Sequence, residues 1–114
     1  MNLGEVINKL GLEVCCGAPD TDCTVTGAYV SDLLSNVIAT AKQGNVWITV
    51  QSHANVVAVA VLKELAAVII VQGKEPAEQT IRKAKEENVT ILLSQQGAYE
   101  VAGKLYQIGV GVLQ

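Results

Sequence analysis

The strongest pattern in the chain is a pair of β-branched runs separated by an apolar segment of helix length. The first run covers residues 45–50, the apolar segment covers residues 55–65, and the second run covers residues 67–71. Polar residues follow both runs, and Gly73 comes shortly after the second. This order is typical of a parallel strand–helix–strand unit, because parallel strands are buried on both faces and are apolar throughout. The unit is the predicted core of the domain.

Helical and extended patterns alternate through the rest of the chain. We expect helices over residues 3–10, within 32–43, from 76 to 87 and from 98 to 105, and strands over 13–16, 24–30 and 89–93. The two N-terminal strands are expected to pair with each other at an edge of the sheet. Residues 110–113 form an apolar tail that is either an edge strand or a contact with a partner. The predicted fold class is therefore α/β, with a mostly parallel central sheet and helices on both faces.

Two features point to burial or to an interface. The segment 55–65 is apolar on nearly every side, with polar residues in its body only at Lys63 and Glu64. A helix of this kind is either sandwiched inside the domain or buried against another copy. Tyr99 and Tyr106 lie two turns apart on the last predicted helix, at a core edge or at an interface. In the helix that begins near Pro76, we expect Ala77, Ile81 and Ala84 to face inward.

Composition narrows the class of protein. The 114 residues suit one domain spanning residues 1–114, with 50% hydrophobic residues and 17% charged residues. The net charge of -3 leaves no basic face for a nucleic-acid backbone, so we expect no nucleic-acid partner. No apolar run is long enough to cross a bilayer, and the N-terminus does not resemble a secretory signal. These features predict a cytoplasmic protein with no membrane partner.

Three cysteines and one histidine are the residues with reactive chemistry. Cys15, Cys16 and Cys23 are odd in number, which favours a reducing compartment over a disulfide framework. They are either buried small hydrophobes or, less in keeping with their spacing, metal ligands, and we predict no metal and no cofactor. His53 lies near a predicted helix N-terminus, where the helix dipole disfavours imidazolium and favours a neutral hydrogen-bonding role. Asp32, next to Ser31, is expected to cap a helix.

Three polar loops follow the buried strands, at residues 51–55, 72–75 and 94–97. Ligands of parallel sheets bind outside the carboxyl ends of the strands, so these loops are expected to converge. They offer amides, hydroxyls, an imidazole and an ammonium group, which suit recognition of an anion or a polar small molecule. The alternative is that these residues only cap helices. The candidate ligand-binding residues are Gln51, Ser52, His53, Asn55, Gln72, Gly73, Lys74 and Ser94.

Four stretches of the chain resemble the DRTGG domain family. They are GAYVSDLL at residues 27–34, NVWITVQ at 45–51, VIIVQGKEP at 68–76 and YEVAGKLY at 99–106, and the resemblance covers about residues 25–107. It implies a fold similar to the N-terminal domain of HPr kinase and, more distantly, to the uridine-side domain of Mur ligases. It also implies a stand-alone member of the kind found in anaerobes, linked to redox or hydrogenase metabolism.

The motif that names the family is mostly absent here. Its Asp-Arg pair falls within residues 51–55, and its Thr-Gly-Gly falls at Val71, Gln72 and Gly73, of which only the last glycine is present. The family is not known as a catalyst by itself, so the resemblance implies a regulatory or interaction domain.

Three hypotheses of function follow. The first is a non-catalytic regulatory or interaction domain that forms a homodimer and contacts a protein partner. The second is a sensor of a nucleotide or another phosphate-bearing metabolite, bound at the strand carboxyl ends. The third, ranked last, is an enzyme that uses His53 or a cysteine. We therefore predict that the protein is not an enzyme.

Overall fold

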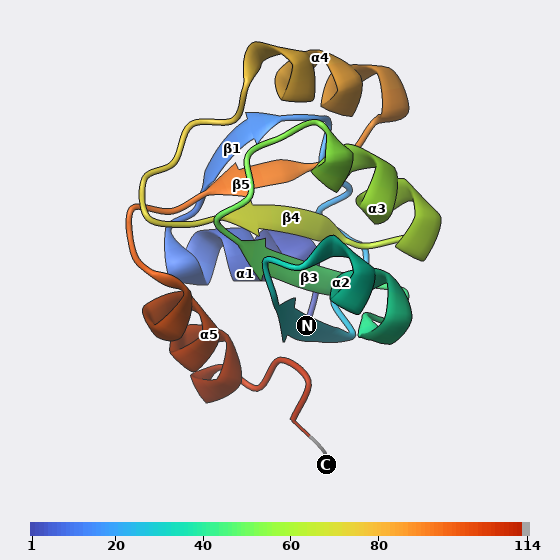
Figure 1. Ribbon diagram of the computed structural model, residues 1–114. Helices are drawn as coiled ribbons and strands as arrows, with labels where there is room; N and C mark the ends of the chain where they lie inside the picture. The colour runs from blue at the N-terminus through green and yellow to red at the C-terminus, as the bar shows by residue number, and fades with distance from the viewer. Residues whose placement is uncertain (113–114) are drawn as a thin grey trace.

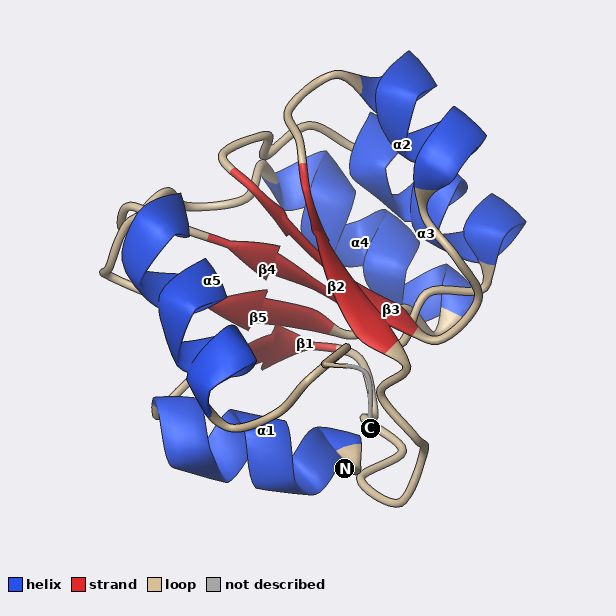
Figure 2. Ribbon diagram, turned by 90° about the horizontal axis from the view of Figure 1, so that it is seen from below, coloured by secondary structure: helices blue, strands red, loops and turns tan. Residues whose placement is uncertain are grey.

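The computed structural model describes residues 1–112 and has three layers, with one sheet between two layers of helices (Figures 1 and 2). The sheet has the order β1-β5-β4-β3-β2. Its strands are β1 (Glu13–Cys16), β2 (Gly27–Val30), β3 (Asn45–Thr49), β4 (Ala67–Ile70) and β5 (Ile91–Leu93). The helices are α1 (Leu3–Leu10), α2 (Leu34–Thr40), α3 (Asn55–Lys63), α4 (Glu78–Glu87) and α5 (Ala98–Gln107).

Four consecutive strands, from β2 to β5, are parallel and lie side by side in chain order. Because the crossovers between parallel strands share one hand, consecutive steps in one direction place α2, α3 and α4 on the same face. The other face is covered by α1 and α5 (Figure 2). The predicted α/β class, with helices on both faces of a mostly parallel sheet, is confirmed.

The strands alternate their side chains between two apolar layers. Ile48, Ile69 and Leu92 pack with α1 and α5, whereas Trp47 and Val68 pack with the helices of the other face. Trp47 is fully buried, and its indole Nε1 donates a hydrogen bond of 2.7 Å to the Ser31 carbonyl, so its one polar group is satisfied. Burial on both faces explains why β4 is apolar along its whole length and β3 is apolar over residues 46–48.

The predicted pairing of the two N-terminal strands is wrong. β1 pairs antiparallel with β5, and β2 pairs parallel with β3, so these strands lie at opposite edges of the sheet. The connection between them crosses the sheet, and only residues 27–30 of the predicted strand 24–30 are extended in the ladder. The tail is not an edge strand over residues 110–112, where Val110 is buried in the core against α1 and α5; Leu113 lies outside the described residues.

Helix positions also differ from the pattern in places. α4 begins at Glu78, after Pro76, so Ala77 is exposed. Ala84 is fully buried and Ile81 packs against the core, as predicted, and Thr80 is also fully buried. Tyr99 and Tyr106 are exposed by 86% and 70%, and therefore lie on the surface of α5 instead of at the core edge.

In the part of the chain that the structure describes, no helix is long and apolar enough to cross a membrane.

Gly17 allows the chain to leave β1 against the start of β5. Its φ is +90°, and a Cβ there would lie 2.5 Å from the Val89 carbonyl oxygen. Gly11 also has a positive φ, +62°, but a Cβ there would meet nothing within 4 Å. A comparison of substitutions at the two positions therefore separates the cost of backbone strain from the cost of a steric clash.

We predict that Gly17→Ala destabilises the protein by about 3 kcal/mol or more, because left-handed strain adds to a backbone clash. Gly11→Ala serves as the matched control and should cost about 1 kcal/mol, since only the strain applies. Urea unfolding monitored by Trp47 fluorescence measures both changes. Equal costs for the two variants would contradict the close approach of Gly17 to β5.

Candidate functional site

The three predicted loops converge at the carboxyl edge of the sheet. Between the second and third loops, the Gln72 N–H donates to the Gln96 carbonyl at 2.8 Å, and the Gly73 N–H donates to the Ser94 carbonyl at 2.9 Å. The buried Thr80 hydroxyl, on α4 after the second loop, donates to the Ser52 carbonyl of the first loop at 2.7 Å. The loops therefore hold one another in place, as the strand-end argument predicts.

Asp32 ties the end of β2 to the end of β3. Its Oδ1 accepts hydrogen bonds from the Thr49 hydroxyl at 2.8 Å and from the Val50 N–H at 2.9 Å, and its carbonyl accepts from Gln51 Nε2 at 3.0 Å. The prediction that Asp32 caps a helix is wrong, since α2 begins at Leu34 with no side-chain cap. Thr49 is a polar residue that directly follows three buried apolar residues of β3, and this pattern could have indicated a buried hydrogen-bond partner.

The groups left free for a ligand at this edge are mainly side chains. The N–H groups of Gln72 and Gly73 are used by the neighbouring loop, so they do not form an open anion cradle. The His53 Nδ1 accepts a hydrogen bond of 3.3 Å from the Asn55 N–H, so this side chain is used within its own loop. Among the described residues, no hydrogen bond involves the Lys74 ammonium or the Gln72 side-chain amide, and both residues are exposed.

The cysteines lie away from these loops. Cys16 pairs with Ile91 at the start of β5, and Cys23 lies in the connection between β1 and β2. Cys15, Cys16 and Cys23 are free thiols, and each is buried or partly buried against one of the two apolar layers. Within residues 1–112, no group of acidic, histidine and cysteine side chains is placed to hold a metal ion. The interpretation of the thiols as small apolar residues is therefore favoured.

Burial raises the pKa of Cys16 to about 12, and the neighbouring Cys15 adds to the shift. A thiol whose pKa is raised by folding stabilises the folded state below its unfolded pKa, and this contribution is lost as pH rises toward the folded value. We predict that the free energy of unfolding falls between about pH 9 and pH 12, and falls less steeply in Cys16→Ala. Urea titrations across this range give both slopes, and identical slopes would contradict a neutral buried thiol.

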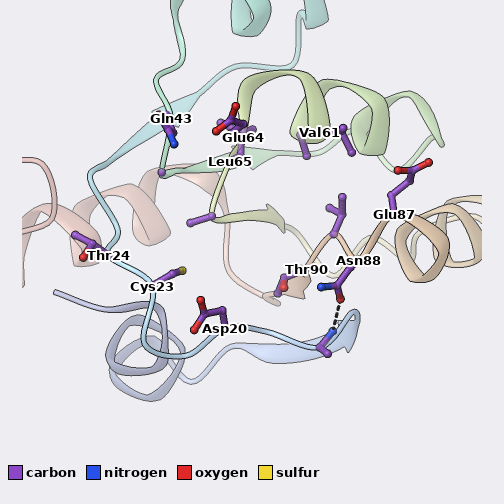
Figure 3. Close-up of a pocket in the computed structure, with 15 residues that line it drawn as sticks. Asp20, Cys23, Thr24, Gln43, Val61, Glu64, Leu65, Glu87, Asn88 and Thr90 are labelled. Carbon is purple, nitrogen blue, oxygen red and sulfur yellow. Dashed lines mark hydrogen bonds between the residues drawn. The ribbon is translucent and has the colours of Figure 1, made fainter.

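A cleft of 480 Å³ opens at the opposite, amino edge of the sheet (Figure 3). Gly44, Ala66 and Thr90, which come just before β3, β4 and β5, lie along its floor. The C-terminal ends of α3 and α4 and the connection between β1 and β2 form its sides. None of the candidate residues from the sequence lines it. No local pattern marks this cleft, because its sides come from segments that are far apart in the chain.

The three-layer fold, the interlocked loops at one edge and the cleft at the other define a small α/β domain with surfaces suited to binding. A family model described as the DRTGG domain matches residues 5–108. The chain therefore belongs to the DRTGG domain family, which is a family of regulatory domains.

One solved structure is similar in fold. It is the crystal structure of the CBS and DRTGG domains of the regulatory region of Clostridium perfringens pyrophosphatase, complexed with its activator, diadenosine tetraphosphate. The two chains align with a TM-score of 0.74 and 16% sequence identity, over 97% of this chain and 48% of that one. This chain thus spans about half of the pyrophosphatase structure, and the likeness shows the fold alone. The comparison with curated proteins gives no match.

The turn after β4 has two consecutive residues in the left-handed conformation. Gln72 and Gly73, where the family resemblance puts two glycines, have φ values of +63° and +66°. Glycine adopts this conformation without steric cost, whereas glutamine does not. The backbone at Gln72 is therefore one that glycine would adopt at lower cost.

Proposed function

We propose that residues 1–114 act as one non-catalytic regulatory domain in the cytoplasm, and that the domain works as a homodimer joined along β2. Membership of a regulatory domain family supports the general role. The observation that carries the dimer is an uncharged strand at the edge of the sheet, flanked by exposed apolar side chains. The link to redox or hydrogenase metabolism stays a prediction from the family resemblance.

The two edge strands differ in how they resist self-pairing. β1 carries Glu13, and its ladder with β5 is irregular between Val14 and Cys16. Charges and bulges on an edge strand are the usual protection against pairing with another chain. β2 has the sequence GAYV, with a regular ladder and no charged residue. Gly111 of the C-terminal tail lies close to Gly27 and Ala28, so the second half of β2, at Tyr29 and Val30, is the better surface for a second copy.

The β2 patch is formed by Leu33 in the turn after β2 and by Ile38 of α2, which are exposed by 64% and 40%. Val30 of β2, exposed by 48%, lies on the other face of the sheet, where it lines a groove with Ala102 and Tyr106 of α5. The Tyr29 hydroxyl donates to Asn36 Oδ1 at 2.6 Å and fixes α2 beside the strand. A two-fold axis next to β2 would bring the same patch of both copies together, as isologous dimers require.

We predict that Leu33→Lys converts the dimer to a monomer, because it places a charge in the centre of the patch. Leu62→Lys is the matched control, since Leu62 on α3 is exposed by the same 64%. Sedimentation equilibrium should give a dimer for the wild type and for Leu62→Lys. A wild type that is strictly monomeric at high micromolar concentration would contradict the proposal. A Leu33→Lys variant that remains a dimer would also contradict it.

A second candidate is a sensor of a nucleotide or another phosphate-bearing ligand at the carboxyl edge. Two observations favour it: the loops that carry Gln51, Ser52, His53, Asn55, Gln72, Gly73, Lys74 and Ser94 converge there, and the similar pyrophosphatase structure is a complex with a dinucleotide. The free Lys74 ammonium and the exposed imidazole of His53 supply donors for an anion.

The sensor predicts thermal stabilisation by ATP or by diadenosine tetraphosphate. A ligand at about 100 times its dissociation constant adds about 2.7 kcal/mol to the stability of the folded state. Lys74→Gln should reduce the shift in melting temperature, whereas Lys83→Gln, an equal charge change on α4, should not. The absence of any shift with both ligands would count against the sensor.

The third hypothesis is an enzyme that acts through His53 or a cysteine, and a nucleophile–base pair of the two gains no support from the geometry. His53 follows β3 at the carboxyl edge, whereas Cys16 and Cys23 lie toward the amino edge of the parallel strands. A nucleophile and its base need to be within hydrogen-bonding reach of each other.

A further inference from the structure

The cleft at the amino edge combines three acidic side chains with two helix C-termini. Asp20, Glu64 and Glu87 come from three separate segments around the opening (Figure 3). Glu64 is the C-cap of α3, and Glu87 is the last residue of α4. The C-terminal end of a helix carries partial negative charge, so a carboxylate there is electrostatically unfavourable until a cation lies nearby. None of the described residues that line the cleft is Lys, Arg or His.

Thr90 gives an independent sign of a ligand. Its side chain is part of the cleft, only 6% of the residue is exposed, and its hydroxyl makes no hydrogen bond with any described residue. Figure 3 shows it across the cleft from Asp20 and Cys23. Because no fully buried side-chain nitrogen or oxygen of the described residues lacks a partner, this hydroxyl keeps some contact with the solvent of the cleft. It is an unpaired polar group on a nearly buried residue and can bond to a molecule in the cleft. Its position on the floor makes it available to a ligand that enters between the acidic groups.

The sides of the cleft also contain aliphatic surface. Val61 and Leu65 of the α3 end and Ala66 before β4 lie beside the acidic groups. The cleft is therefore suited to a ligand with an apolar body and positively charged ends. Its volume of 480 Å³ is within the range of about 300–1,000 Å³ that small-molecule sites have.

From this arrangement we propose that the cleft binds an aliphatic diamine or polyamine. The ammonium groups lie near Asp20, Glu64 and Glu87, one N–H donates to the Thr90 hydroxyl, and the methylene chain lies against Leu65. A metal ion is a poorer match, because the acidic and thiol groups of the described residues do not gather to coordinate one. A phosphate-bearing ligand is disfavoured by the negative sign of every charged group in the cleft. This site is separate from the β2 patch and from the carboxyl-edge loops.

Calorimetric titration of the full chain with putrescine and with spermidine, at constant ionic strength, tests the proposal. Thr90→Val keeps the shape and net charge and should weaken binding about fivefold, since one hydrogen bond is lost. Glu87→Gln should weaken binding about threefold. Glu86→Gln is the matched control: it makes the same charge change one position earlier on α4, outside the cleft, and should leave the affinity unchanged. Butylamine, with one ammonium group, should bind more weakly than putrescine.

Two results would overturn the proposal. One is the absence of measurable binding of both amines at millimolar concentration. The other is an equal effect of Glu86→Gln and Glu87→Gln together with no effect of Thr90→Val, which would indicate general attraction to an acidic protein. Chemical unfolding keeps the Thr90 test interpretable: Thr90→Val should be at least as stable as the wild type, because the substitution removes an unpaired hydroxyl from a buried position.

Discussion

The structure depends on one constraint: four parallel strands that are buried on both faces and follow one another across the sheet in chain order. Burial of Trp47, Ile48, Val68 and Ile69 requires helices above and below the strands. The common hand of the crossovers assigns α2, α3 and α4 to one face, so α1 and α5 have to cover the other. The same order sends the carboxyl ends of these four strands to one edge of the sheet and their amino ends to the opposite edge. It also leaves β2 with a strand on one side only, and Gly111 of the C-terminal tail lies close to Gly27 and Ala28.

Function in this domain follows from those three surfaces. At the carboxyl edge, the backbone N–H groups of Gln72 and Gly73 serve loop–loop hydrogen bonds, so these two donors are not open to a ligand. At the amino edge, a cleft lies between the ends of α3 and α4 and the connection between β1 and β2. The outer side of β2 offers an uncharged edge with apolar neighbours. Each surface suits binding, and this agrees with a regulatory family.

The local pattern of the sequence was enough to predict the class of fold and the central unit. β3 and β4 begin where the β-branched runs begin and end one residue before the runs do, because continuous burial leaves a clear local signal. The convergence of the three loops also followed from strand direction alone. The partners of β1 could not be predicted, since a four-residue strand that is exposed over its first half fits either edge. The bonds of Asp32 to Thr49 and Val50 were missed because they join residues far apart in the chain.

The cleft was missed for a related reason. Glu64 and Asn88 end their helices in left-handed conformations, at φ values of +52° and +54°, although neither residue is a glycine. The sequence therefore lacks the glycine that usually marks such a helix end. Only tertiary packing brings these ends beside Asp20 and Thr90. In the sequence, Thr90 is an ordinary residue next to a buried strand. Only the structure shows that it lines the cleft and that its hydroxyl has no partner among the described residues.

Hydrogen–deuterium exchange measured over a range of protein concentrations tests most directly whether the domain works through its free edge. If two copies join along β2, the amides of residues 27–30 become more protected as the concentration rises, while those of β1 at the other edge do not change. Exchange in β2 that is independent of concentration, up to the high micromolar range, would contradict the account.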